Sequence, residues 1–145
     1  MEKYQRDLTD FKTIIMGRKT YEVGYQYGLK PGQCAYPHME HFIFSDHLNF
    51  QEQDPKLHVK PMQLAEIEKI REAADTDVYL CGGGQFAGWL LDNQKIDLLK
   101  IKLNPLILGE GVKLFGDSRQ SVKTELLATE LYDGGLQIMT YKVVY

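Results

Sequence analysis

Two glycine-containing segments of this sequence have the residue types needed to bind phosphate groups. The segment Gly17–Thr20 follows the apolar residues 14–16, and the segment Gly82–Gly84 follows residues 78–81, which read Val-Tyr-Leu-Cys. Glycine lets a phosphate approach the backbone closely, and a helix start offers unpaired N–H groups and about half a unit of positive charge. Ligands of open α/β sheets bind at the carboxyl ends of strands. The two segments, each at the end of a predicted strand, therefore predict a pyrophosphate-binding site at that end of the sheet.

The first segment adds two cations and a hydroxyl. The Arg18 guanidinium can hold a phosphate through two hydrogen bonds, the Lys19 ammonium supplies a point charge, and the Thr20 hydroxyl can cap a helix or donate to a phosphate. Taken alone, this segment is equally consistent with a turn followed by solvated side chains. The run of three glycines is stronger evidence that a ligand comes close to the backbone. Each glycine costs about 1 kcal/mol relative to alanine in regular structure, so such a run is seldom neutral without a function. Neither segment has the Gly-x-Gly-x-x-Gly pattern of a Rossmann domain.

The elements that position these segments alternate along the first two thirds of the chain. Short apolar or β-branched runs predict buried strands, and apolar residues spaced three and four apart predict helices. Pro61 is expected at the first turn of one helix, whose buried stripe is Leu64, Ile67, Ile70 and Ala74. The predicted strands are 13–16, 41–45, 57–60 and 77–81, and the predicted helices are 2–12, 18–24, 61–74 and 85–91.

The last third of the chain has a different pattern. Residues 96–103 alternate between apolar and charged, which is typical of a strand with one face in water. Two long strands, 122–132 and 136–145, are joined by Asp133-Gly134-Gly135, whose residue types suit a hairpin turn. We therefore expect one mixed sheet, parallel first and antiparallel at the end, with helices on both faces.

Composition restricts the partners and the compartment. The 145 residues include 20 acidic and 17 basic ones, a net charge of −3, which argues against nucleic acid as a partner. No apolar run reaches the roughly 18 residues that span a bilayer, so no membrane partner is expected. Residues 1–10 are charged and do not resemble a signal peptide, which favours a cytoplasmic protein.

Cysteine and histidine do not suggest a metal centre. Cys34 and Cys81 do not make a disulfide framework, and neither belongs to a Cys-x-x-Cys pair, so we expect both as reduced thiols, with Cys81 buried in a strand. The four histidines, His38, His41, His47 and His58, are expected in loops or on the surface rather than as zinc ligands.

Three motifs resemble one superfamily. Residues 15–22, Ile-Met-Gly-Arg-Lys-Thr-Tyr-Glu, resemble the second-strand motif of dihydrofolate reductases, and residues 78–84 resemble their later glycine motif. Residues 104–111, Asn-Pro-Leu-Ile-Leu-Gly-Glu-Gly, followed by Leu114-Phe115, are similar to the reductase domain of the bifunctional riboflavin-biosynthesis deaminase–reductase and its stand-alone bacterial relatives. The resemblance covers nearly the whole chain. It implies one domain over residues 1–145 with a three-layer α/β/α dihydrofolate-reductase-like fold, whose mixed, mostly parallel sheet ends in an antiparallel hairpin.

The resemblance also implies a cofactor and its binding residues. The cofactor would be NADPH, with Arg18 at its 2′-phosphate and the glycine run, joined by a cis peptide between its first two members, along the pyrophosphate and nicotinamide. Hydride transfer would go to a C=N or C=O group of a pyrimidine- or pterin-like small molecule, which in the riboflavin branch is the ribosyl carbonyl of a phosphorylated aminopyrimidine. Relatives often form homodimers. The implied cofactor-binding residues are Gly17, Arg18, Lys19, Thr20, Ser45, Gly82, Gly83, Gly84, Gln85 and Phe86.

One departure from the family pattern leaves the activity open. Family members usually begin with a central strand that carries a Ser-x-Asp-Gly-type motif, and this sequence opens on the helix expected before the second strand. The loss should leave apolar edges on two neighbouring strands. The chain is then a fragment, a protein whose gap is filled by a partner, or a domain without catalysis. No catalytic residue is assigned. The alternatives to a reductase are an NADPH-binding module without turnover and an interaction protein with no such ligand.

Overall fold

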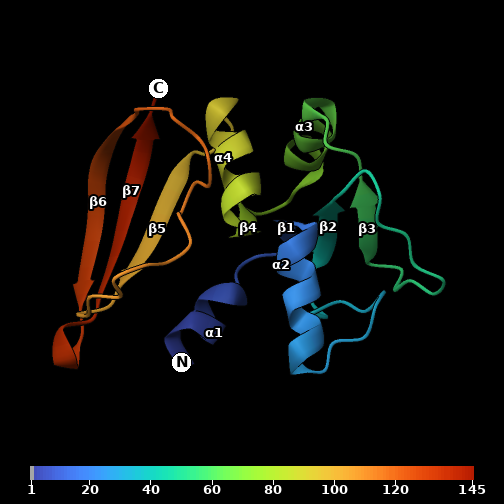
Figure 1. The fold of residues 1–145 in the computed structure, drawn as a ribbon, viewed down its shortest axis with the longest axis horizontal. Coiled ribbons are helices and arrows are strands. Elements are labelled where there is room, and N and C mark those ends of the chain that lie inside the picture. Colours follow the sequence, from blue (N-terminus) through green and yellow to red (C-terminus); the bar gives the residue numbers. More distant parts are fainter. Residues whose placement is uncertain (1) are drawn as a thin grey trace. The chain divides into compact units, whose positions relative to one another are not determined.

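The computed structural model describes residues 2–145 and divides into two compact units, the first ending at Gly83 and the second running from Gly84 to Tyr145. The first unit contains α1 (Glu2–Leu8), β1 (Thr13–Gly17), α2 (Arg18–Val23), η1 (Gly24–Tyr27), β2 (Glu40–Phe44), β3 (Leu57–Lys60), α3 (Leu64–Ala73) and β4 (Val78–Gly82). The second unit contains α4 (Gly84–Asp92), β5 (Leu98–Leu103), β6 (Lys123–Leu131), η2 (Asp133–Gly135) and β7 (Gln137–Val144), all shown in Figure 1.

The first unit is built on a parallel sheet with the strand order β3-β2-β1-β4. Its strands are short apolar runs, as expected for strands covered on both faces. Gly17 lies opposite Phe44 on β2, and Met16 lies opposite Gly82 on β4. The carboxyl ends of these three neighbouring strands therefore meet at one edge of the sheet.

The core of this unit lies on one face of the sheet. Alternate strand residues, Ile14 and Met16 of β1 and Ile43 of β2, pack in one buried cluster with Leu8 of α1 and Tyr21 of α2. The residues that alternate with them point to the other face. Thr13 and Ile15 of β1 are buried there, so both faces of the sheet are covered.

The Tyr21 hydroxyl ties the chain that follows η1 back to α2. It donates to the Gln33 carbonyl at 2.7 Å and accepts from the Gly32 N–H at 3.1 Å. Gly32 has φ +88°, and a β-carbon there would lie 1.9 Å from the Glu52 carbonyl oxygen. Only glycine fits this position, where the segments around residues 32 and 52 touch.

The second unit is built on an antiparallel sheet with the order β5-β7-β6. The hairpin between β6 and β7 has Gly134 and Gly135 at φ +82° and +87°, and the Tyr132 N–H donates to the Leu136 carbonyl across the turn. The hairpin predicted from Asp133-Gly134-Gly135 is therefore confirmed. One face of the sheet carries charged residues: Glu125 is directly opposite Lys142, and Lys100 lies on the same face, opposite Thr140.

Two glycines let a loop approach α4 closely. A β-carbon on Gly84 would lie 2.5 Å from the Lys113 carbonyl oxygen, and one on Gly88 would lie 2.3 Å from the Phe115 carbonyl oxygen. The loop is also held by side chains, because Gln85 Nε2 donates to Asp117 Oδ2 at 2.8 Å. The Gly-x-x-x-Gly spacing along α4 is thus explained by backbone packing.

The predicted α/β class, with parallel strands first and antiparallel strands last, is confirmed. The strands form two sheets rather than one mixed sheet, so β4 and β5 each end a sheet. Helix α3 begins at Leu64 rather than at Pro61, because Pro61 and Met62 belong to a turn: the Gln63 N–H bonds the Pro61 carbonyl and the Met62 N–H bonds Asp46 Oδ1. Within residues 2–145 no helix is long and apolar enough to cross a membrane.

Candidate functional site

The carboxyl-terminal edge of the parallel sheet gathers most of the residues predicted to bind a cofactor. Gly17 ends β1, Ser45 follows β2, and Gly82 ends β4. Because β1 lies between β2 and β4, these three positions are neighbours along one edge. This is the edge at which ligands of open α/β sheets bind.

The closest approach between the two glycine segments is made by Thr20. A β-carbon on Gly83 would lie 2.9 Å from Thr20 Oγ1, and one on Gly82 would lie 3.7 Å from it. The absence of a side chain on Gly83 therefore allows the Thr20 hydroxyl to lie close to the backbone of residues 82–83. Glycine backbone beside a hydroxyl donor is the kind of surface that a phosphate group can approach closely. The peptide between Gly82 and Gly83 is cis, as the resemblance implies.

The two cations of the first segment are exposed at the start of α2. Arg18 and Lys19 are both exposed to solvent, and Arg18 Nε lies 3.8 Å from Glu22 Oε1, one helical turn away. An exposed pair at that distance contributes little to stability. The Arg18 guanidinium therefore retains donors that can bind an anion at the sheet edge.

Ser45 has a structural role that the sequence did not reveal. Its hydroxyl oxygen accepts the backbone N–H groups of His47 at 3.2 Å and Leu48 at 3.1 Å, and its own N–H bonds the Lys60 carbonyl. These bonds fix the turn that leaves β2. The hydroxyl hydrogen can still be donated to a ligand oxygen.

The remaining three predicted residues open α4 in the second unit. Gly84 directly follows Gly83 in the chain and contacts the loop described above. The Gln85 side chain holds Asp117, and the Phe86 side chain is buried and stacks on Trp89 with ring centroids 5.9 Å apart. The side chains of Gln85 and Phe86 therefore make contacts within the second unit itself.

Partly buried hydroxyl and thiol groups of the first unit are held in their protonated forms, and Cys81, which was expected to be buried, is only partly so. Burial raises the pKa of Cys81 and of Tyr79, and it raises the pKa of Cys34 to about 11. Both cysteines are free, and neither is a thiolate nucleophile at neutral pH. The Tyr79 hydroxyl is 2.8 Å from the Tyr4 hydroxyl, and the two groups hydrogen-bond to each other.

His41 corrects one prediction, because it is fully buried rather than a loop or surface residue. Its Nδ1 bonds the Met39 carbonyl at 2.9 Å, and its Nε2 accepts the Tyr36 N–H at 3.1 Å. Burial lowers the pKa of His41, which keeps the ring neutral and fits the acceptor role of Nε2. No sequence signal marked this residue, since both partners are backbone groups.

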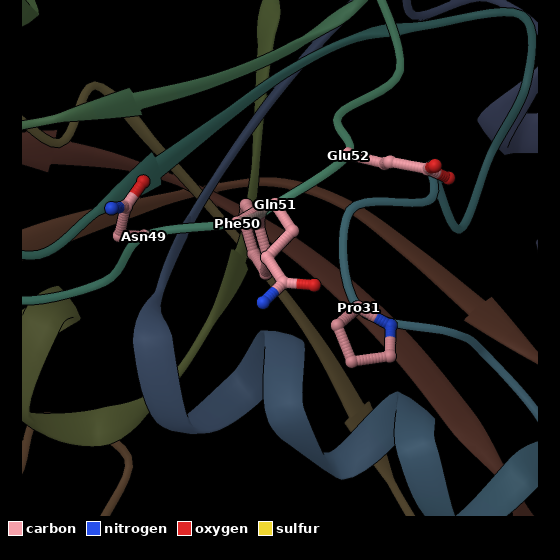
Figure 2. A pocket seen from close by; sticks show the side chains of 5 residues that line it. All are labelled: Pro31, Asn49, Phe50, Gln51 and Glu52. Carbon is pink, nitrogen blue, oxygen red and sulfur yellow. The ribbon is translucent and has the colours of Figure 1, made fainter.

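Other features of the described chain do not point to a site. Residues 2–145 contain no group of three or more histidine, cysteine or acidic residues able to hold a metal ion. A hollow where two loops meet is lined by Pro31, Asn49, Phe50, Gln51 and Glu52 (Figure 2). A second hollow is lined by Glu2, Gln5, Arg6 and Thr9 of the N-terminal segment. Neither includes a residue predicted to bind the cofactor.

The fold is that of reductase-like proteins linked to riboflavin biosynthesis. A putative riboflavin biosynthesis protein from Shewanella sp. PV-4 superposes with a TM-score of 0.76 at 23% identity, covering 93% of this chain and 75% of that one. A pyrimidine reductase-like protein from Corynebacterium diphtheriae gives a TM-score of 0.66 at 13% identity, covering 93% and 77%. RibD from Acinetobacter baumannii gives 0.64 at 13% identity, covering 92% of this chain and 47% of RibD.

Sequence comparison defines the family. The model of the RibD C-terminal domain matches residues 3–138, and the chain therefore belongs to that family. The uncharacterized protein YyaP of Bacillus subtilis is 23% identical over 145 residues, covering 92% of this chain and 75% of YyaP. The resemblance drawn from the three sequence motifs is thus confirmed.

Proposed function

We propose that this chain is an NADPH-dependent reductase that transfers hydride to a C=N or C=O group of a pyrimidine- or pterin-like substrate. The observation that supports it most is that the two glycine segments meet at the carboxyl ends of neighbouring strands, where the Thr20 hydroxyl lies close to the backbone of residues 82–83. Membership of the RibD C-terminal domain family supports the same chemistry.

Different residues of the first unit would bind different groups of the cofactor. Thr20 and the backbone at Gly83 would take the pyrophosphate, and Lys19 would add a positive charge to it. Arg18 would hold the 2′-phosphate, which distinguishes NADPH from NADH, because a guanidinium matches phosphate geometry. Ser45 would donate its hydroxyl hydrogen on the adenosine side. Gly84, Gln85 and Phe86 remain candidates for the nicotinamide side.

The bound nicotinamide would supply the hydride, and the protein would supply orientation. No residue is assigned as an acid or base. The segments at this edge, Gly17–Thr20 and Gly82–Gly83, contain no carboxyl or imidazole group. This absence of an acid within the segments favours, as a second candidate, a module that binds NADPH without turnover.

NADPH binding by an Arg18→Ala variant tests the assignment. Loss of a charge-assisted phosphate contact should weaken NADPH binding by roughly 1–3 kcal/mol, with little effect on NADH. Nicotinamide fluorescence titrations of both cofactors measure this. Arg119→Ala, which removes an exposed arginine outside the predicted site, should bind NADPH like the unmodified chain. Equal NADPH affinity in the two variants would contradict the role of Arg18.

A turnover assay distinguishes the reductase from the module that only binds NADPH. The chain with NADPH is incubated with dihydrofolate or with the phosphorylated aminopyrimidine of riboflavin biosynthesis, and nicotinamide absorbance is followed. Decay with either substrate supports the reductase, and binding without decay supports the module. No NADPH binding at all would reject both.

A further inference from the structure

Helix α2 carries a single acidic residue, which lies beside the arginine of the proposed cofactor site. Arg18 is the first residue of α2, and Glu22 follows one helical turn later. Glu22 Oε1 lies 3.8 Å from Arg18 Nε, and the two side chains are 38% and 43% exposed. Residues 13–27, which make up β1, α2 and η1, contain no other acidic side chain. Within these elements, Glu22 is therefore the one negative charge near an anion that Arg18 binds.

The contact between Arg18 and Glu22 is poorly suited to stabilising the helix. A pair four residues apart stabilises a helix best when the acid precedes the cation, because that order matches the helix dipole. Here the cation comes first, and exposed pairs are worth little in any case. The separation of 3.8 Å also exceeds hydrogen-bond distance, so this contact leaves the guanidinium N–H groups available. Glu22 therefore acts on Arg18 mainly through its charge.

The charge of Glu22 also affects a second neighbour. Tyr25 lies three residues further along the chain, and its pKa is raised first by burial and then by the Glu22 carboxylate, which opposes another negative charge nearby. The same repulsion would act on a phosphate held by Arg18. Such a phosphate would lie roughly 7 Å from the Glu22 carboxylate, because the guanidinium stands between the two anions.

NADPH and NADH differ in the group that would be repelled. NADPH carries a 2′-phosphate with close to two negative charges, whereas NADH carries a hydroxyl at that position. At roughly 7 Å in a medium close to water, the repulsion should lower the affinity for a 2′-phosphate by about threefold to fivefold at low ionic strength. The pyrophosphate is common to both cofactors, so its interaction with Glu22 cancels when their affinities are compared.

We propose that Glu22 is a specificity-determining residue of the cofactor site. Its carboxylate weakens the binding of the 2′-phosphate to Arg18 and so narrows the preference for NADPH over NADH. The same repulsion acts on NADP⁺, which keeps the 2′-phosphate after hydride transfer, so the oxidised cofactor is also released more readily. This inference rests on the proposed function, because it takes Arg18 to hold the 2′-phosphate.

Substitutions that change the charge at residue 22 test the proposal. Nicotinamide fluorescence titrations with NADPH and NADH give the ratio of the two affinities for each variant. Glu22→Gln should raise the preference for NADPH by about threefold to fivefold at roughly 10 mM salt, and Glu22→Lys by about tenfold or more. Glu22→Asp keeps the charge and should stay within about twofold of the unmodified chain. At about 1 M salt the differences should disappear, because screening then acts over about 3 Å.

The matched control is Glu72→Gln, the same substitution at an exposed position of α3. Helix α3 begins after β3, at the carboxyl ends of the strands, and runs back to the amino end of β4, so Glu72 lies at the far end of the sheet. This variant should leave the ratio of affinities unchanged. Because the expected effect of Glu22→Gln is a gain of affinity, misfolding would not produce it.

Arg18→Ala separates this inference from the proposed function. If Arg18→Ala leaves NADPH binding unchanged, the assignment of the 2′-phosphate to Arg18 is wrong, and the role of Glu22 is overturned with it. If Arg18→Ala weakens NADPH binding but Glu22→Gln leaves the ratio unchanged or lowers it, only the role of Glu22 is overturned. An equal rise in Glu72→Gln would show a general effect of net charge and would also overturn it.

Discussion

The two units of this protein use β-structure in opposite ways. In the parallel sheet of the first unit, β1 and β2 are buried, with Ile14 and Ile43 fully inaccessible. In the antiparallel sheet of the second unit, β6 is exposed along almost its whole length. Parallel strands joined by helices are covered on both faces, whereas an antiparallel hairpin needs cover on only one. The first unit thus encloses its central strands in a core, whereas the second leaves its edge strand β6 exposed.

The same contrast appears in matched local features. Each unit has a glycine in the left-handed region and a tyrosine hydroxyl that bridges two backbone groups. In the first unit these features are enclosed, and in the second they face solvent. Substituting matched residues in the two units therefore measures how much burial adds to the contribution of the same local geometry to the free energy of unfolding.

The largest expected difference is between Gly32→Ala and Gly109→Ala. Both glycines have positive φ, +88° and +79°, but a β-carbon at residue 32 would collide with the Glu52 carbonyl, whereas one at residue 109 meets nothing within 4 Å. Gly32→Ala should lower the free energy of unfolding by about 2–5 kcal/mol and Gly109→Ala by about 1–2 kcal/mol. Urea denaturation followed by circular dichroism measures both. Equal losses would show that the contact near Glu52 is not tight.

A smaller difference is expected between Tyr21→Phe and Tyr145→Phe. The Tyr145 hydroxyl donates to the Ile96 carbonyl at 2.8 Å and accepts its N–H at 3.1 Å, much as Tyr21 bridges Gln33 and Gly32. Tyr21 is 1% exposed and Tyr145 is 47% exposed. Tyr21→Phe should cost about 1–3 kcal/mol because it leaves a buried N–H unpaired. Tyr145→Phe should cost less than about 1 kcal/mol, since water can replace the hydroxyl. The same denaturation assay would contradict this if the two losses were reversed.

The smallest effect is a pH dependence carried by His41. Its pKa in the folded protein is below the ordinary 6.5, so the unfolded chain binds more protons between the two values. Stability should be complete above pH 6.5 and fall as the pH drops below it, no more steeply than about 1.4 kcal/mol per pH unit for one proton. Asp54 and Glu40 oppose this shift, and His38 adds to it.

Substitution isolates the contribution of His41. His41→Gln keeps a donor and an acceptor but cannot titrate, so its stability should depend less on pH between about 6.5 and 5. His47→Gln, in an exposed loop, should keep the slope of the unmodified chain. Unfolding curves at several pH values measure this. An unchanged slope in His41→Gln would mean that another group titrates.

Much of the fold could be predicted because local patterns are strong where strands and turns are short. The strand at residues 57–60 has the predicted bounds, and the strand predicted at 13–16 extends by one residue to Gly17. The predicted helix start at Pro61 was wrong, since a proline suits both the first helical turn and the turn before it. His41 was misplaced because a histidine with two backbone partners has no signature in sequence.

The candidate site could be predicted only in part. Gly17–Thr20 and Gly82–Gly83 were identified from residue type and family resemblance, and the structure brings them to one edge. The interactions of Ser45 with the turn after β2 and of Gln85 with Asp117 could not be predicted. Both depend on how loops pack, and loop sequences carry no periodic signal.

The sequence by itself determined the elements, their order and the glycines at the strand ends, because each depends on side chains a few residues apart. Only the tertiary structure decided that the strands form two sheets and that Thr20 lies beside Gly83. Strand partners and register depend on contacts between residues distant in the chain, and a shift of one residue reverses every face.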